Sequence, residues 1–348
     1  MGGRVIGRIA GLSRAHGARH NQGLDRMTAL IAVLLVLLIV LAAAIVFGGP
    51  STPAPLPWIN NPFLAVDYSN LPPLQHFPGD DGVSLAYRQY APGSAHPRGS
   101  VVLIHGSSAS SASMHVLAKG YAHEGFAVYV LDMRGHGESG TKGTIAYVGQ
   151  LEDDIDAFVR AVAPVQPATL AGFSAGGGFV LRYAASARQI QFQSYLLLAP
   201  FLGGRAPNAR PGTGGWASLG FPRLMVVFFL NSLGIRVFND LPVIRFALNE
   251  QARSVLTPQY SFSLMANFQP HLDFAADIRA ANRPCAAVAG GDDELLYSDK
   301  LKQTFHDLSR DWPVTLIPGV THITLILDPA AIKAAVSAVV DLQSKTAS

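Results

Sequence analysis

The chain has 348 residues, one cysteine and a formal net charge of +3, from 26 basic and 23 acidic side chains. A single cysteine excludes an intramolecular disulfide, and the length allows one large folded core behind an N-terminal extension. The basic excess lies in the first fifty residues, so it gives no support for a nucleic-acid-binding surface in the folded part.

Residues 1–26 form a basic head with a net charge of +4. Its charged side chains are Arg4, Arg8, Arg14, Arg19, Asp25 and Arg26. Without this head, the chain is close to neutral. Because basic segments stay on the cytoplasmic side of a membrane, we expect a cytoplasmic N-terminus.

Residues 27–47 carry no charge and are long enough to cross a bilayer, which needs about 20 apolar residues. We predict an uncleaved single-pass anchor with the folded part outside the cytoplasm, periplasmic or extracellular. The alternative is a secretory signal cleaved near Ala42–Ala44. Its apolar region usually spans only about 7 to 15 residues, which favours the anchor.

Residues 48–79 are rich in proline and predict an extended, semi-rigid linker. Trp58, Phe63 and Phe77 lie within it. These aromatic side chains could lie at the membrane surface or pack on the folded domain, and the sequence leaves both open.

Two short apolar runs, Val101–Ile104 and Ala127–Leu131, are typical of strands buried inside a parallel sheet. The first ends in a His105-Gly106 dipeptide, and the second enters the loop 132–139. In this loop, side chains that brace a tight turn by hydrogen bonds are expected at Asp132, Arg134 and His136.

The stretch Gly172–Gly176 reads Gly-Phe-Ser-Ala-Gly and lies between an apolar run and a helical pattern. A serine on such a sharp strand-to-helix turn needs glycines on both sides, because the chains pass very close. The pattern therefore predicts Ser174 as a nucleophile. The N–H of Ala175, at the helix N-terminus, can receive the negative charge of a carbonyl oxygen under attack.

The alternation of strands and helices breaks between residues 200 and 283, which predicts a separate cap over the sheet. Two strongly apolar segments, 224–230 and 241–248, are expected to be buried helices of the cap core. A second interpretation is that part of this surface lines an acyl-binding pocket or touches the bilayer.

An acid and a base should follow the serine, each on a loop after a later strand. The apolar run 284–290 leads into three carboxylates, Asp292, Asp293 and Glu294, which leaves the acid open from position alone. The strand 314–317 and a turn lead to His322, the expected base. No His, Cys and Asp spacing suggests a metal site.

In the order of these motifs, the chain resembles the α/β-hydrolases, and within them the lysophospholipase-like and monoacylglycerol lipase-like members of the serine aminopeptidase branch. The resemblance implies a mostly parallel sheet with helices on both faces, a core of residues 80–199 and 284–348, and a helical cap at 200–283. The G-x-x-D pattern counted from Gly290 selects Asp293, with Asp292 as the alternative acid. The family's HG loop implies the second oxyanion N–H at Ser107.

The resemblance implies a serine hydrolase that cleaves carboxylic esters through an acyl-enzyme, without a cofactor. Lysophospholipids, monoacylglycerols and other acyl esters are the expected substrates. The same triad also supports aminopeptidases, amidases and acyltransferases. A peptidase should offer an acid in the cap to bind a free amine, and the candidates are Asp240, Glu250, Asp273 and Asp277. A non-catalytic scaffold with this fold is the alternative of another class.

Overall fold

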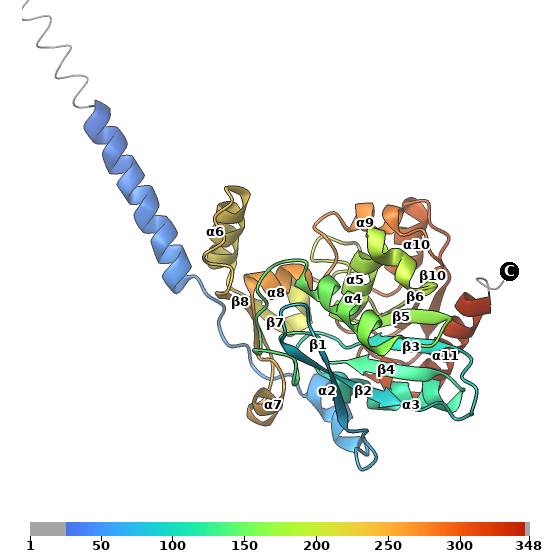
Figure 1. Cartoon of the computed structure of the whole chain (residues 1–348). Coiled ribbons are helices and arrows are strands. Elements are labelled where there is room, and N and C mark those ends of the chain that lie inside the picture. Colours follow the sequence, from blue (N-terminus) through green and yellow to red (C-terminus); the bar gives the residue numbers. More distant parts are fainter. Residues whose placement is uncertain (1–25, 345–348) are drawn as a thin grey trace, which may run out of the picture.

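The computed structural model describes residues 26–344, and its centre is an eight-stranded sheet in the order β1-β2-β4-β3-β5-β6-β10-β11 (Figure 1). Neighbouring strands are parallel from β4 to β11, whereas β2 is antiparallel to both β1 and β4. The strands are β1 (Leu74–Pro78), β2 (Ser84–Tyr90), β3 (Ser100–Ile104), β4 (Ala127–Leu131), β5 (Ala168–Phe173), β6 (Ser194–Leu198), β10 (Cys285–Gly290) and β11 (Val314–Ile317). The predicted α/β-hydrolase fold is confirmed.

Helices cover both faces of this sheet, and the figure shows them as two layers (Figure 1). One layer contains α3 (His115–His123) and α11 (Pro329–Ser344), and the other contains α4 (Gln150–Val162), α5 (Ala175–Ala184) and α9 (Phe274–Ala280). The remaining elements of the core are η2 (Ser111–Met114), η3 (Ala187–Gln191), α10 (Lys300–Asp307) and η5 (Thr324–Ile326). Strands β3, β4, β5, β6 and β10 are buried at every position, which explains their unbroken apolar sequences. Cys285 at the start of β10 is only 3% exposed, and burial raises the pKa of its thiol.

The cap between β6 and β10 is not purely helical, which corrects one expectation. It contains a three-stranded antiparallel sheet in the order β7-β8-β9. Its elements are η4 (Pro211–Gly215), β7 (Ala217–Leu219), α6 (Phe221–Ser232), β8 (Pro242–Phe246), α7 (Glu250–Val255), β9 (Gln259–Ser261) and α8 (Phe262–Asn267). The segment 241–248, expected as a helix, is largely strand β8, because partners on both sides satisfy its backbone. The segment 224–230 is helical in α6, but only Val226 and Val227 of that helix are buried.

The proline-rich segment is not an extended linker throughout, which corrects a second expectation. It contains α2 (Pro57–Asn60), η1 (Asn61–Ala65) and strand β1. Proline at the first position of α2 suits a helix start, and β1 is an edge strand, where proline is tolerated. Phe77 in β1 is buried in the core. The core therefore begins before the boundary expected at residue 80.

A helix of 22 residues, Arg26–Phe47, precedes this segment and projects away from the rest of the molecule (Figure 1). We call it the N-terminal helix. Its mean hydropathy of 3.5 and its length are sufficient for a membrane span, and none of its most apolar window is buried in the protein. Apart from Arg26, the basic head lies outside the described residues.

Candidate active site

Ser174 lies on the turn between β5 and α5, with backbone angles of φ 56° and ψ −118°. Residues other than glycine rarely adopt this backbone conformation, and hydrogen bonds to the surrounding backbone hold it in place. The N–H of Ser174 donates to the carbonyl of Leu198 on β6 over 2.8 Å, and its carbonyl accepts from Gly178 and Phe201. The serine predicted from the Gly-Phe-Ser-Ala-Gly pattern therefore stands at the carboxyl end of the central strands.

Both glycines of the pattern are required by close backbone contacts. A Cβ at Gly172 would lie 2.3 Å from the carbonyl oxygen of Gly176. A Cβ at Gly176 would lie 2.3 Å from the carbonyl oxygen of His105. These distances are far below van der Waals contact, so any larger residue would displace the turn that carries Ser174.

The structure brings Ser174, His322 and Asp293 together in one hydrogen-bonded chain. The serine Oγ lies 2.9 Å from His322 Nε2, and His322 Nδ1 lies 2.7 Å from Asp293 Oδ2. The other carboxylate oxygen of Asp293 accepts the N–H groups of Leu295 and Leu296, each over 2.8 Å. His322 and Asp293 are both 2% exposed. This arrangement can transfer a proton from the serine hydroxyl to the imidazole.

The two neighbouring carboxylates occupy different positions. Asp292 is exposed, and its side chain makes no hydrogen bond to His322. Glu294, which the sequence analysis leaves without a role, accepts the backbone N–H of His322 over 2.8 Å. The sequence carries no signal for this contact, because it forms only when two separate loops meet.

The two residues predicted to bind an oxyanion lie close to Ser174. The residues Ser107 and Ala175 both line a cavity that also contains Ser174 and His322. Within the described part of the chain, neither amide donates to a protein acceptor. The Oγ of Ser107 accepts a hydrogen bond of 2.8 Å from Trp216 Nε1, which comes from the cap. A developing oxyanion at Ser174 could be bound by these two amides.

His105 is fully buried and holds its loop rather than the reacting atoms. Its Nδ1 lies 2.8 Å from the carbonyl oxygen of Gly106, and its Nε2 accepts the N–H of Met133 over 3.2 Å. Burial lowers the pKa of His105, so the ring is neutral at neutral pH. These contacts give His105 a structural role in the loop that leads to Ser107.

The charged side chains of the loop 132–139 also act as braces, as expected. Asp132 accepts the N–H groups of Ser111 and Glu138 over 2.6 and 3.0 Å. Arg134 forms ion pairs of 2.9 Å with Asp81 and 2.7 Å with Asp154. These contacts tie the loop to η2, to the turn between β1 and β2, and to α4, and they do not involve Ser174.

A chain of hydrogen bonds that the sequence does not reveal connects the cap to these loops. The hydroxyl of Tyr260, on β9, accepts the N–H of Ser108 over 2.5 Å and lies 2.6 Å from His136 Nε2. Burial lowers the pKa of His136 well below its usual value. A neutral His136 can accept a hydrogen bond from the Tyr260 hydroxyl, so the cap sheet is joined to the loop that carries Ser107.

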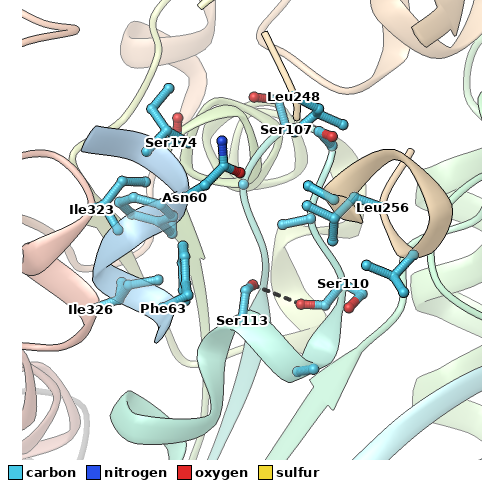
Figure 2. A pocket seen from close by; sticks show the side chains of 18 of the residues that line it. Asn60, Phe63, Ser107, Ser110, Ser113, Ser174, Leu248, Leu256, Ile323 and Ile326 are labelled. Atoms are coloured by element: carbon cyan, nitrogen blue, oxygen red, sulfur yellow. Dashed lines mark hydrogen bonds between the residues drawn. The ribbon is translucent and has the colours of Figure 1, made fainter. Parts of the chain in front are cut away.

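A cavity of about 440 Å³ opens beside Ser174 (Figure 2). Ser174 and Ser107 lie at one end, and Ser110 and Ser113 lie at the other. The walls between them are mainly apolar. They include Phe63, Leu248, Leu256, Ile323 and Ile326.

One wall of this cavity comes from the segment that the sequence predicts as a linker. We call residues 57–71 the strap. Its residues on the cavity are Ile59, Asn60, Phe63, Leu64, Tyr68 and Leu71. The strap is attached to the domain by the N–H of Leu56, which donates to Ala247 over 3.2 Å, and by Asn70, whose side chain lies 3.0 Å from His115 Nε2. Aromatic side chains of the proline-rich segment thus pack on the domain.

A second, smaller cavity of about 120 Å³ lies on the cap side of Ser174. Its lining includes Trp216, Ile244, Phe246, Met265 and Phe268. Trp216 borders both cavities. Among the described residues, neither cavity is lined by an aspartate or a glutamate. Over residues 26–344, no group of three or more His, Cys, Asp and Glu is arranged to hold a metal.

Comparison with solved structures supports the fold. A soluble variant of monoglyceride lipase from Saccharomyces cerevisiae, in complex with a substrate analogue, aligns with a TM-score of 0.60 at 18% identity, covering 81% of this chain and 98% of that one. The monoacylglycerol lipase of Paleococcus ferrophilus aligns with a TM-score of 0.54 at 20% identity, covering 73% and 99%. At these identities the similarity establishes the fold alone.

Sequence comparison identifies the family. A monoacylglycerol lipase of Mycolicibacterium smegmatis is 36% identical over 113 residues, which span 31% of this chain and 40% of that relative. The family described as "Serine aminopeptidase, S33" matches residues 95–329, well over half of the chain. The chain therefore belongs to the S33 serine aminopeptidase family and has the α/β-hydrolase fold.

Proposed function

We propose that this chain is a membrane-anchored esterase that hydrolyses acyl esters such as monoacylglycerols or lysophospholipids. The proposal rests on one observation: the hydrogen-bonded chain of Ser174, His322 and Asp293 opens directly onto a largely apolar cavity of about 440 Å³. A cavity of this size and lining suits an acyl chain better than a charged group.

The reaction follows from the geometry. His322 Nε2 takes the proton of Ser174, and the serine oxygen attacks the ester carbonyl. The N–H groups of Ser107 and Ala175 hold the oxyanion, and His322 then gives its proton to the leaving alcohol. Water, activated by the same histidine, releases the fatty acid. Asp293 orients the imidazole and stabilises its charged form.

The positions of the cap carboxylates favour an ester over a peptide substrate. An aminopeptidase needs a negative group near the site to bind a free amine. Of the candidates for this role, Asp240 and Asp273 are exposed, Glu250 begins α7, and Asp277 is hydrogen-bonded to His271 over 2.7 Å. None of them lines either cavity.

The relatives point the same way. The Mycolicibacterium smegmatis relative is a monoacylglycerol lipase, and the yeast structure is a monoglyceride lipase. We further propose that the N-terminal helix is retained as an anchor, with the basic head cytoplasmic and the catalytic domain on the other side. Cleavage of a signal near Ala42–Ala44 is the alternative.

The test is hydrolysis of p-nitrophenyl esters of increasing acyl length by the full chain in nonionic detergent, with Ser174→Ala as the control. We expect activity that rises with acyl length and vanishes in the variant. Equal inactivity of both proteins, together with no reaction of Ser174 with a fluorophosphonate, would instead indicate a non-catalytic scaffold. Cleavage of amino-acid p-nitroanilides in preference to esters would favour the aminopeptidase.

A further inference from the structure

Helix α6 and the turn after it leave large apolar side chains facing solvent. We define the α6 patch as Met225, Phe228, Phe229, Leu233, Ile235 and Val237. Their exposure ranges from 42% at Ile235 to 77% at Val237. The helical members recur every three or four residues, so they share one side of the helix. A soluble domain seldom exposes a contiguous apolar surface of this kind without a partner.

Helix α6 begins beside the C-terminal end of the N-terminal helix (Figure 1), where the N–H of Arg223 donates to the carbonyl of Gly48 over 3.2 Å. Arg223, in the first turn of α6, makes this connection. Its Nε donates to the carbonyl of Ile45 over 2.8 Å, and its Nη2 donates to that of Val46 over 3.0 Å. Its Nη1 donates to Pro242 on β8 over 2.8 Å. One guanidinium therefore binds carbonyls at the end of the N-terminal helix, which lack helical partners, and also binds the cap sheet.

The packing around Arg223 is equally close. A Cβ at Gly220 would lie 2.6 Å from the carbonyl carbon of Gly49, so only glycine allows the two chains to approach. Ile45 packs against a cluster that includes Val227 and Phe262 of the cap. The end of the N-terminal helix and the cap thus form one packed unit.

We propose that the α6 patch lies in the same lipid leaflet as the C-terminal end of the N-terminal helix. The inference rests on the proposed membrane anchoring. Because Arg223 and Gly220 fix α6 against that end, the patch stays next to side chains that the bilayer would cover, including the exposed Val46 and Phe47. Lipid is the partner that matches an apolar surface continuous with an anchor.

The charged groups near the patch are consistent with a lipid surface. Arg236 is the charged residue of the turn 233–237 and is exposed. Its long aliphatic stem can carry the guanidinium to the phosphate layer while the neighbouring Ile235 and Val237 remain in the acyl region. Arg223 has its donors occupied by backbone carbonyls, as a cation near lipid requires.

The test places an NBD fluorophore at single introduced cysteines in the full chain. The protein is reconstituted in vesicles of phosphatidylcholine and phosphatidylglycerol at about three to one, with and without doxyl-labelled lipid. Phe229→Cys probes the patch, Leu35→Cys probes the N-terminal helix, and Ile190→Cys is the matched exposed apolar site on the core. The native Cys285 is 3% exposed and is not labelled in the folded protein.

We expect doxyl lipid to quench the labels at residues 229 and 35 to a similar extent and to leave the label at residue 190 bright. Quenching at residue 35 without quenching at residue 229 would overturn the inference and leave the anchoring intact. No quenching at residue 35 would overturn both. Protection of residue 229 from aqueous iodide without quenching by doxyl lipid would mean that a second protein copy covers the patch, which also contradicts the inference. Met225→Cys repeats the measurement, and hydrolysis of a short ester confirms that each variant is folded.

Discussion

At Asp293, both carboxylate oxygens have hydrogen-bond partners that fix the orientation of the group. One oxygen faces His322 Nδ1, and the other accepts two backbone N–H groups of the following turn. The carboxylate can therefore hold the imidazole in a single tautomer, with the bare Nε2 toward Ser174. Asp292, next to it in sequence, points into solvent.

This difference predicts the effects of two asparagine substitutions. Asp293→Asn should reduce kcat by about 10⁴, the loss known for the same change in a serine protease triad, because the amide favours the wrong tautomer of His322. Asp292→Asn should leave kcat within about twofold, as expected for an exposed site. Steady-state hydrolysis of one p-nitrophenyl ester measures both. A large loss in Asp292→Asn alone would mean that the assignment of the acid is wrong.

The buried His136 predicts how stability depends on pH. Its native pKa lies well below 6.5, so as the pH falls below about 6.5 the unfolded chain takes up a proton that the native chain does not. The free energy of unfolding should therefore decrease as the pH is lowered, by up to about 1.4 kcal/mol per pH unit for this group. His105 and His115, whose pKa values are also lowered by burial, act in the same direction.

Chemical unfolding followed by tryptophan fluorescence, between about pH 7 and pH 5, measures this dependence. In His136→Gln the titrating group is removed, and we expect a shallower decrease than in the unchanged protein. An identical pH slope in the two proteins would show that the pKa of His136 is not lowered in the native state.

Among the elements, the strap forms one wall of the site, although its sequence predicts only a linker. Phe63 is half-buried and lines the cavity, as do the buried Ile323 and Ile326 (Figure 2). Phe63 comes from the strap, whereas Ile323 and Ile326 come from the segment around η5, so two distant parts of the chain line the same cavity. In the proposed esterase, the strap would limit the length of the acyl chain that the cavity accepts.

Enlarging this wall should change chain-length preference without removing activity. In Phe63→Trp we expect kcat/KM for a dodecanoyl ester to fall about tenfold or more, since pockets discriminate strongly against added volume, while the acetyl ester changes little. Phe228→Trp is the matched control, because Phe228 is exposed on α6 away from the cavity. Equal losses for both esters would show that Phe63 supports folding rather than acyl length.

The elements that sequence predicted best are those defined by local chemistry. The serine turn needs Gly172 because a Cβ there would collide with the carbonyl of Gly176, four residues further on, and the buried parallel strands are almost wholly apolar. The elements that it missed depend on distant partners. The apolar sequence of strand β8 favours a helix, and its strand conformation depends on pairing with β7 and β9. The strap depends on hydrogen bonds to Ala247 and His115.

The same reasoning applies at the site. Ser174 and His322 follow from motifs and strand positions, whereas three adjacent carboxylates offer no local distinction. The roles of the carboxylates become distinct only when two loops meet. Asp293 then binds the ring of His322, and Glu294 accepts the backbone N–H of His322. The link from Tyr260 to His136 likewise joins the cap to a core loop across 124 positions of sequence.

On the scale of the whole molecule, the N-terminal helix, the cap and the catalytic core form a connected series. Arg223 joins the helix end to the cap, and Tyr260 and Trp216 join the cap to the loop that carries Ser107. Each joint consists of hydrogen bonds between parts that are far apart in sequence. The position of the core relative to the N-terminal helix is therefore set by specific contacts rather than by a free tether.

The strap also has a consequence for any shed form of the protein. The chain that leaves the N-terminal helix builds a wall of the catalytic cavity before it enters the sheet at β1. A protease that cuts before Pro57 would release a domain in which all walls of the cavity beside Ser174 are present. A cut between η1 and β1 would release the same triad with one side of the cavity open. The place of the cut, and not release itself, would then decide whether the released domain keeps this wall of its cavity.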